Sequence, residues 1–397
     1  MQHLQQGPLA PHRPARTRAA LLPVAALAAL GLAGCANNGD DHAAQIAAGQ
    51  ETFRFDTFGD EAQWTDRLRM HEVIQGAVDP VTALSVGLKV DAGALPPGVL
   101  QSADLHSPAT TVALIKLNAV VGIKGTVENV GGRDTLTRVG ITCALCHSTV
   151  DDSVQKGIGQ RLDGYPNRDL NPGAIIGLSP ALTAAQRAVY NSWGPGRYDP
   201  RFNRDGINHP VLIPPAYGLK GSPLATYTGD GDIPYWNSYV AVTQMGGQGV
   251  FVDARIGADV ERTPDLVTPK LPALAEYQLS LSAPPPPAGS FDAEAARRGQ
   301  GVFAGQARCS SCHGGDDHTD GRLHTPAETG VDGTYAARSA TKMYRATPLR
   351  ALWQHAPYFH DGSAATLDAV VDFYDANQHL GLSTQQKADL VAYLKSL

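Results

Sequence analysis

The sequence GITCALCHSTV, residues 140–150, places Cys143, Cys146 and His147 within five consecutive positions. The same frame returns in ARCSSCHGG, residues 307–315. The whole chain of 397 residues has only 5 cysteines and 13 histidines. Random placement of so few residues would produce this frame only ~0.002 times, so its repetition indicates one chemistry used twice.

The frame C-x-x-C-H is the attachment signature of c-type haem. Its two thiols form thioethers to the vinyl groups, and the adjacent His becomes the proximal iron ligand. A disulfide, or a zinc site built from both cysteine pairs, is the alternative, but neither needs a His directly after each pair. The sequence therefore predicts two covalently bound haem c groups. They attach through Cys143, Cys146, Cys309 and Cys312, with His147 and His313 as iron ligands.

The first 35 residues have the pattern of a targeting segment. Arg13, Arg16 and Arg18 precede the apolar run at residues 21–34, which is shorter than the roughly 20 residues that span a bilayer. The run ends in LAGC, which resembles the lipobox of bacterial lipoproteins, whose Cys (here Cys35) is lipidated. The alternative is an ordinary signal peptide with a chance Cys. We expect export, with a lipid anchor at Cys35 on the periplasmic side of a bacterial membrane.

Composition indicates a globular protein with long loops, because 43% of residues are apolar, 18% are charged, and there are 42 Gly and 28 Pro. One cysteine at the lipobox and two in each motif leave none for a disulfide framework. The net charge of −6 argues against nucleic acid as a partner. We expect a small redox protein or a quinol-chain cytochrome as the electron partner, and the membrane through the lipid anchor.

The C-terminal hundred residues have the clearest helical signals. One helix leads into the second motif, and another begins with a capping box from Ser383 to Gln386. Between them, the run ATLDAVVDFYDANQ has helical spacing that puts four side chains on one buried face. These four are Leu367, Val370, Val371 and Tyr374.

The predicted fold is mainly α, with two cytochrome c-like haem domains, long loops and an N-terminal extension. Residues 36 to about 50 read as a flexible tether, and the segment that follows gives no firm helix or strand prediction. The predicted divisions are a lipoprotein signal peptide (1–34), a tether and N-terminal extension (35–139), an N-terminal haem c domain (140–281), a Pro-rich linker (282–290) and a C-terminal cytochrome c domain (291–397).

The stretch TPLRALWQHAPYFHDGSAATLDAVVDFY (347–374), followed by LSTQQKADLVAYLKSL, resembles the diheme cytochrome c peroxidase and MauG superfamily. In that family the position fourteen residues after the His of PYFHDG supplies the sixth ligand of the C-terminal haem, as Met in peroxidases and Tyr in MauG. The resemblance implies Tyr374 here, which would stabilise ferric iron. A core aromatic is the alternative for Tyr374. The rivals for the ligand are Met343, His360 and His379.

The first haem segment departs from the peroxidase pattern. Peroxidases of the family place a Glu over the substrate-binding haem, where it moves a proton. Between His147 and Val260 this chain contains no Glu. Asp163, Asp205 or Asp232 could substitute, but none lies in the family's motif, so the resemblance does not by itself imply peroxidase activity.

The same segment resembles the diheme rubber oxygenases in GAIIGL (173–178), in Tyr235 with Trp236, and in Phe251. That branch has an oxygen-binding haem beneath an apolar distal pocket. The resemblance implies a dry pocket that holds dioxygen against an apolar substrate, with Trp236 and Phe251 as candidate catalytic residues. Ordinary core packing is the alternative. The residues implied are Ala174, Ile175, Leu178, Trp236 and Phe251.

Further residues could serve the irons. Met245 and His209 are candidates for the sixth position of the first haem, and Trp193 or Trp236 could carry electrons between the haems. Calcium accompanies the family at its domain interface. The sequence GDGD (229–232) offers oxygen ligands, with a solvated turn as the alternative reading.

The sequence thus predicts an exported diheme c-type cytochrome of the peroxidase and MauG type. Its C-terminal haem would relay electrons, and its N-terminal haem would react with peroxide or dioxygen. The alternative is an electron-transfer cytochrome in which both irons have two protein ligands and catalyse nothing. The sixth ligand of the first haem separates these two functions.

Overall fold

The computed structural model describes residues 37–397, so the predicted signal peptide and the lipidation site Cys35 lie outside the described residues. The chain divides into two units, Met1–His42 and Ala43–Leu397. Among the described residues, no helix is both long enough and apolar enough to cross a membrane.

Short helices and one long hairpin make up the segment before the first motif. The hairpin pairs β2 with β3 and has a register shift between Thr126 and Val127. The predicted tether is wrong from residue 37 onward, because these residues begin helix α1. The elements are α1 (Asn37–Phe55), the π-helix η1 (Ala62–Arg67), α2 (Met70–Ala77), α3 (Pro80–Ser85), β1 (Val90–Asp91), the 3-10 helix η2 (Ala92–Ala94), α4 (Val99–Ser102), α5 (Pro108–Lys116), β2 (Ile123–Val130) and β3 (Arg133–Ile141).

The segment with the first motif is rich in loops, as its Gly and Pro content predicts. Its strands are short and pair two by two. The elements are α6 (Ala144–His147), β4 (Ser148–Val150), β5 (Ile158–Gly159), β6 (Arg161–Asp163), α7 (Pro172–Gly177), α8 (Ala184–Asn191), β7 (Arg197–Tyr198), α9 (Phe202–Asp205), β8 (Val211–Leu212), α10 (Ile233–Tyr239), the π-helix η3 (Val240–Met245), β9 (Val250–Asp253), η4 (Ala254–Ile256), β10 (Ala258–Glu261), η5 (Thr268–Lys270) and α11 (Leu271–Ser280).

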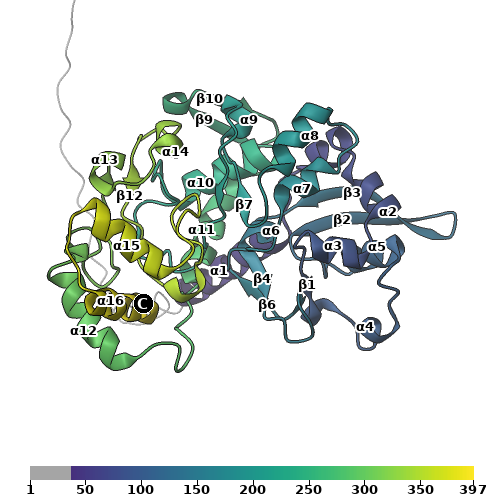
Figure 1. Cartoon of the computed structure of the whole chain (residues 1–397). Helices are drawn as coiled ribbons and strands as arrows, with labels where there is room; N and C mark the ends of the chain where they lie inside the picture. Colours follow the sequence, from purple (N-terminus) through teal and green to yellow (C-terminus); the bar gives the residue numbers. More distant parts are fainter. Residues whose placement is uncertain (1–36) are drawn as a thin grey trace, which may run out of the picture. The chain divides into compact units, whose positions relative to one another are not determined.

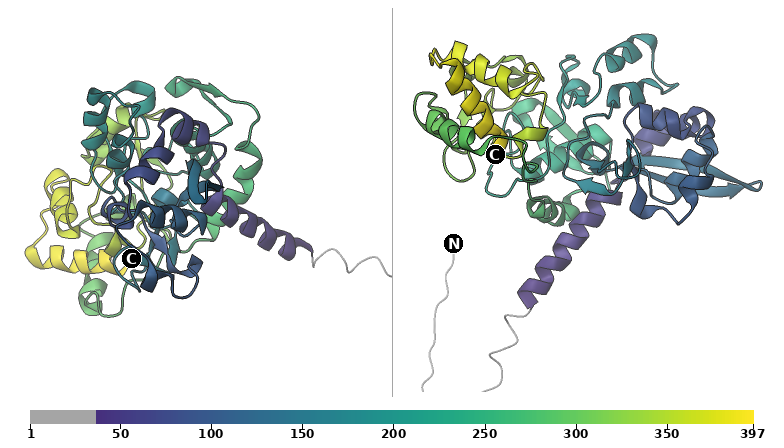
Figure 2. Two further views of the ribbon diagram at one scale, coloured as in Figure 1. Left: turned by 90° about the vertical axis from the view of Figure 1, so that its right-hand side faces the viewer. Right: turned by 60° about the horizontal axis from the view of Figure 1, so that its bottom comes forward.

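The C-terminal segment confirms the three predicted helices. The capping box at Ser383 forms with Gln386, because each side chain accepts the backbone N–H of the other residue. The elements are α12 (Ala293–Ala304), η6 (Cys309–Ser311), β11 (Leu323–His324), α13 (Pro326–Thr329), α14 (Thr334–Ala337), β12 (Tyr344–Arg345), η7 (Leu352–Gln354), α15 (Leu367–Asn377) and α16 (Thr384–Ser396). Within the unit from Ala43 to Leu397, these helices lie at the end opposite the β2–β3 hairpin, with α6 between them (Figures 1 and 2).

A glycine lets α12 and α16 cross with their backbones in contact. A Cβ atom at Gly299 would lie 1.9 Å from the carbonyl oxygen of Asp389 and 2.9 Å from the Cβ of Tyr393. One turn further along α12, the ring of Phe303 meets that of Tyr393 edge-on, with centroids 5.2 Å apart. Only a residue without a Cβ fits this crossing.

The same crossing occurs between α1 and α11. A Cβ at Gly49 would lie 1.9 Å from the carbonyl oxygen of Ala273. The rings of Phe53 and Tyr277 meet edge-on, with centroids 5.5 Å apart. Both first helices read G-Q-x-x-F, and Tyr277 lies four residues beyond Ala273, as Tyr393 does beyond Asp389. Helix α1 therefore stands to the first motif as α12 stands to the second.

Separate apolar cores support the two crossings. The core around α1, α10 and α11 includes Phe53, Trp236 and Leu274. The C-terminal core lies between α12, α15 and α16. A third core, which contains Trp64 and Trp193, joins the segment before the first motif to α7. In the unit Ala43–Leu397, the residues between α1 and the first motif thus form an insertion that shares this core with the segment after the motif.

The crossing at Gly299 can be tested by stability. We expect Gly299→Ala to lower the free energy of unfolding by about 1 to 3 kcal/mol, because the added methyl group forces α12 and α16 apart. Denaturant unfolding followed by circular dichroism measures this change.

Gly301 in the same helix is the matched control, since a Cβ there meets nothing within 4 Å. We expect Gly301→Ala to be neutral or to stabilise the protein by about 0.5 to 1 kcal/mol. Equal effects of the two substitutions would contradict the close crossing.

Candidate haem sites

The first motif lies in the short helix α6, directly after β3. The Nδ1 atom of His147 lies 3.0 Å from the carbonyl oxygen of Pro214. Burial lowers the pKa of His147 to about 4, so the ring is neutral near pH 7. A neutral ring that donates from Nδ1 has its free electron pair on Nε2, which is the form that binds a metal.

The second motif holds its His in the same way. The Nδ1 atom of His313 lies 3.1 Å from the carbonyl oxygen of His318. A hydrogen bond to the backbone of Thr347 also raises the pKa of His313, although burial has the larger effect and lowers it. The Nε2 atom is again the one that carries the free electron pair.

The loops that contact the two imidazoles are equivalent. Pro214 and Thr347 are each followed by a Pro, and three residues later the backbone has a positive φ of 65° at Gly218 and 51° at Ala351. Each of these two residues donates its backbone N–H to the carbonyl oxygen of the residue that directly follows a helix, α11 or α16. The bonds run from Gly218 to Leu281 (2.7 Å) and from Ala351 to Leu397 (2.8 Å).

The four motif thiols are free, so neither pair forms the disulfide considered as an alternative. Burial raises the pKa of Cys143 and of Cys146 to about 12, and that of Cys309 to about 11. All four sulfur side chains nevertheless belong to partly exposed residues. Thiols that are shielded from solvent but retain accessible surface indicate an internal space beside the motif.

A cavity of about 680 Å³ surrounds the second motif, within the range of cofactor pockets. The face of α15 predicted to be buried lines this cavity. The lining includes Cys309, Cys312, His313, Leu367, Val370, Val371 and Tyr374. Thioether-forming thiols, a neutral imidazole and apolar walls fit a covalent haem.

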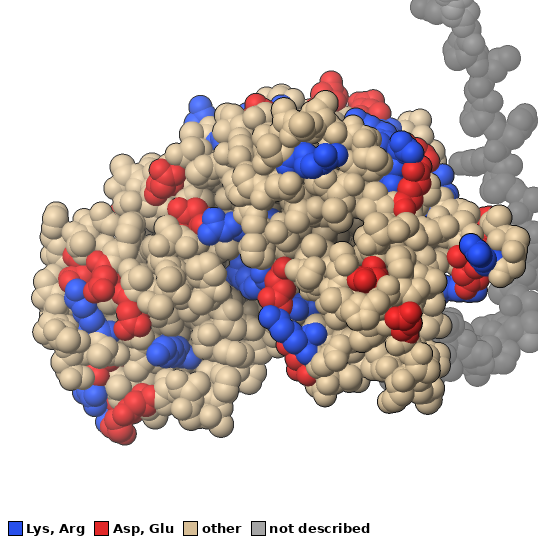
Figure 3. Space-filling model, turned by 45° about the vertical axis from the view of Figure 1, so that its right-hand side comes forward, with Lys and Arg blue, Asp and Glu red and all other residues tan. Residues whose placement is uncertain are grey.

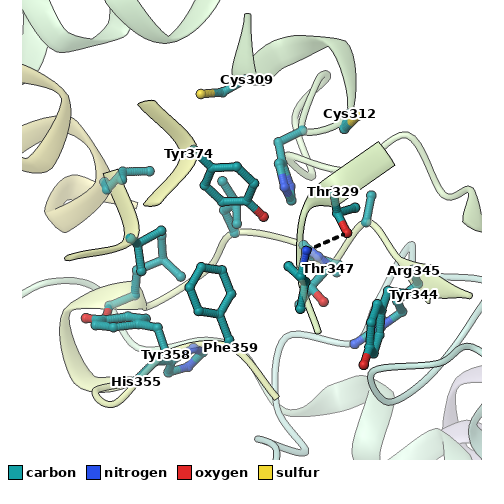
Figure 4. A pocket seen from close by; sticks show the side chains of 18 of the residues that line it. Cys309, Cys312, Thr329, Tyr344, Arg345, Thr347, His355, Tyr358, Phe359 and Tyr374 are labelled. Carbon is teal, nitrogen blue, oxygen red and sulfur yellow. Dashed lines mark hydrogen bonds between the residues drawn. The ribbon is translucent and has the colours of Figure 1, made fainter. Parts of the chain in front are cut away.

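Tyr374 projects its ring into this cavity, beside Phe359 (Figure 4). The two ring centroids are 5.9 Å apart. Burial raises the pKa of Tyr374 to about 12. Among the rivals predicted for this ligand, His360 also lines the cavity, whereas Met343 does not and His379 is exposed.

Two partly buried arginines on the cavity wall have no acidic partner among the described residues. They are Arg168 and Arg345, and their Nε atoms are buried without hydrogen-bond partners. Burial lowers the pKa of both, to about 10 for Arg345. A buried guanidinium group without an anionic partner is destabilising, so these two arginines favour an anion in the cavity. The two propionate carboxylates of a haem would supply it. Sequence reasoning missed these arginines, because nothing in YPNRDLN or MYRATP marks a buried cation.

Three residues predicted for the first haem lie in one apolar core with Cys143. Met245 is 3% exposed, Trp236 7% and Phe251 5%. The rings of Trp236 and Phe251 both pack against Tyr239, with centroids 5.4 and 5.1 Å away. The indole N–H of Trp236 is buried without a partner.

Other residues of the predicted oxygen pocket separate from this core. Leu178 is 45% exposed, so it cannot line a dry pocket, and that expectation is wrong. Ile175 packs beside Cys146 instead. His209 does not join the first motif's core either, because its ring stacks near His360, with centroids 6.2 Å apart.

The acids proposed as substitutes for a catalytic Glu already have partners. Asp163 accepts from Arg54 at 2.5 Å and from the hydroxyl of Tyr277 at 2.6 Å. Asp205 is paired with Arg338, and Asp232 caps α10. These contacts give each carboxylate a structural role.

The GDGD turn, predicted as a possible calcium ligand, is also occupied by protein contacts. Asp230 pairs with the fully buried Arg201 at 2.7 Å and accepts backbone N–H groups of residues 340 and 341. Arg201 also lies over the rings of Trp236, at 5.7 Å, and Tyr335, at 5.0 Å. Arg201 thus links Trp236 to Tyr335, whereas Trp193 lies in the core that contains Trp64.

Comparison with known proteins agrees with this geometry. A family model described as "RoxA-like, cytochrome c-like" matches residues 343–376, so a cytochrome c-like domain is present at the C-terminal end. The chain is 32% identical over 120 residues to the methylamine utilization protein MauG of Methylorubrum extorquens, covering 26% of this chain and 34% of that protein. It is 31% identical over 140 residues to cytochrome-c peroxidase IdrP2 of Denitromonas iodatirespirans, covering 25% and 38%.

These relatives confirm the resemblance to MauG and the cytochrome c peroxidases. The chain spans about a third of the length of the curated relatives it matches. Among solved structures, a MauG-like protein associated with microbial copper homeostasis is similar, with a TM-score of 0.36 and 22% identity over 49% of this chain and 75% of that one.

The role of the buried arginines can be tested by potentiometry. We expect Arg345→Gln in the haem-loaded protein to lower the reduction potential of the C-terminal haem by on the order of 40 mV, or about 1 kcal/mol, because a nearby positive charge favours the reduced iron. The exposed Arg297→Gln serves as the control, since its partner is the surface Glu294. An unchanged potential would argue against the placement of Arg345 beside the C-terminal haem.

Proposed function

We propose that the protein is an exported, lipid-anchored diheme c-type cytochrome, an oxidoreductase of the peroxidase and MauG type. The observation that carries this proposal is the repeated unit. Each C-x-x-C-H motif has its own glycine helix crossing and its own carbonyl on the Nδ1 side of the imidazole. Homology to MauG and a cytochrome c peroxidase supports the same class.

The chain's own residues hold the groups at each site. A haem c supplies an iron that changes oxidation state and, where its sixth position is open, binds a small oxidant. The cysteines of each motif would attach the porphyrin, and the carbonyl of Pro214 orients His147. The backbone carbonyl of His318 orients His313 in the same manner. Arg168 and Arg345 would neutralise propionates beside the second site.

Haem counting tests the two sites directly. The protein, produced with the c-type cytochrome maturation machinery, should contain two haems per chain by the pyridine haemochromogen assay. The variants Cys143→Ala/Cys146→Ala and Cys309→Ala/Cys312→Ala should each contain one. A single haem in the unaltered protein, lost in only one variant, would refute the diheme proposal.

We assign reaction with peroxide or dioxygen to the first haem and electron relay to the second. Helices α10 and α15 occupy equivalent positions. The side chain of Asp232 caps the N-terminus of α10, and that of Thr366 caps α15. Helix α10 packs on α11, and α15 packs on α16. Tyr374 lies eight positions after Thr366, and Val240 lies eight positions after Asp232. Valine has no donor atom, so this position favours an open first iron.

The alternative is an electron carrier, and Met245 is the observation that favours it. Its side chain is buried in the core that contains Cys143. A thioether ligand from Met245 would close the first iron and leave it without catalysis. The backbone carbonyl of Met245 accepts the indole N–H of Trp64 at 3.0 Å, which fixes the end of η3.

Two substitutions separate these functions. If the first iron is open, Met245→Leu should leave its high-spin ferric EPR signal unchanged. Val240→Met should convert that signal to low spin and slow the reaction with peroxide by at least about tenfold, because a thioether then competes for the sixth position.

The carrier function makes the opposite prediction. A low-spin first haem in the unaltered protein that becomes high-spin in Met245→Leu would establish Met245 as the ligand. Far-UV circular dichroism of both variants checks that the fold is retained.

The electron partner we propose is a small redox protein or a quinol-chain cytochrome, with the membrane reached through the anchor at Cys35. On the face shown in Figure 3, acidic and basic side chains are interspersed and often adjacent. A mixed surface of this kind suits brief encounters with a protein partner better than the uniform basic surface that nucleic acids require.

A further inference from the structure

A half-buried histidine, a buried histidine and a carboxylate meet outside the haem motifs. One nitrogen from each of His209 and His360 and one carboxylate oxygen of Asp332 all lie within 4.8 Å of one another. His360 is 3% exposed, whereas Asp332 is exposed. The Nε2 atom of His209 and the Nδ1 atom of His360 are buried with no hydrogen-bond partner among the described residues.

The hydrogen bonds of Tyr344 determine which nitrogen of His360 carries the proton. The Tyr344 hydroxyl donates its only hydrogen to the carbonyl oxygen of Asp332, at 2.6 Å. It lies 3.3 Å from Nε2 of His360, so Nε2 must be the donor in that contact. A neutral His360 therefore has its free electron pair on Nδ1, the atom without a partner.

The two histidines are anchored by contacts with the surrounding fold. The backbone N–H of Leu212, three residues after His209, donates to the carbonyl of His360 at 2.8 Å. The ring of His360 stacks against those of Tyr335 and Tyr344, with centroids 5.7 and 5.0 Å away. The backbone N–H of His209 is fixed by Asp199, at 2.7 Å. The cluster is thus built before any ion binds.

We propose that His209, Asp332 and His360 bind one divalent transition-metal ion of the zinc class. Two imidazoles and one carboxylate match the ligand preference of such ions. Two nitrogens on a tetrahedral zinc lie about 3.3 Å apart, given Zn–N distances of ~2.0–2.1 Å, so small side-chain shifts complete the site. The exposure of Asp332 leaves a fourth position for water. Tyr344 supplies the outer hydrogen bond that orients a metal-binding imidazole.

Zinc titration of the haem-loaded protein tests this proposal. Calorimetry should detect one zinc ion per chain, and zinc should raise the melting temperature because it binds only the folded protein. His209→Gln and Asp332→Asn should each weaken binding by about 100-fold or more. Asn retains the oxygen that accepts the backbone N–H of Thr334, so Asp332→Asn keeps this hydrogen bond. Tyr344→Phe should weaken binding by about 10- to 100-fold.

Two histidine variants act as controls. His106 is a surface residue with an 81% exposed side chain, so His106→Gln should leave zinc binding unchanged. His324 belongs to a different cluster, with Cys312 and Asp320. Loss of binding in His324→Gln but not in His209→Gln would overturn the proposal, as would the absence of any saturable zinc binding. X-ray absorption at the zinc edge should show two imidazole ligands.

Discussion

Backbone contact between two crossing helices is the constraint on which both halves of this protein depend. At Gly299 and at Gly49, a carbonyl oxygen of the partner helix occupies the space that a Cβ would need. Such a contact fixes the helix axes much more tightly than side-chain packing can, because no rotamer change relieves it. The chain segment that leads into each motif begins at such a fixed helix. Each C-x-x-C-H motif thus follows a glycine helix crossing, which lies ten residues before Cys309 and 94 residues before Cys143.

A second shared device fixes the chemistry of the motif histidines. Each is neutral, because burial disfavours the charged ring, and each has its Nδ1 proton on a backbone carbonyl. A backbone acceptor cannot be lost by mutation, so the tautomer that exposes Nε2 depends on loop geometry alone. The proline that follows Pro214 and Thr347, and the left-handed residue three positions later, shape that loop. Helix crossing and loop together define a cytochrome c-like unit more completely than the five-residue motif does.

The features that could be predicted from the sequence are those that depend on local patterns. The helices α12, α15 and α16, the capping box at Ser383 and the resemblance of residues 347–374 to MauG and peroxidases follow from spacing within short windows. The role of α1 could not be predicted that way, because the G-Q-x-x-F pattern of α1 and α12 also occurs outside a helix, at residues 247–251. The pattern acquires meaning only through the carbonyls that the glycine meets. The arginines of the cavity could not be predicted from the sequence either, because the partial burial of Arg168 and Arg345 arises from long-range packing.

The difference between the two units lies in what surrounds equivalent positions. Around the second motif the cavity is wide and lined by charged and phenolic groups, and Tyr374 presents a hydroxyl to it. Around the first, the corresponding helix continues into the π-helix η3, and Val240, Trp236 and Met245 are apolar side chains in or against one core. An insertion of residues 56–142 shares a core with α7 and Trp193 of this segment. A haem that relays electrons needs two protein ligands on its iron and cations that balance its propionates. A haem that reacts with a small oxidant needs a dry, rigid pocket. The insertion adds rigid packing to the segment of the first motif, where a rigid pocket would be needed. We therefore place the reaction at His147.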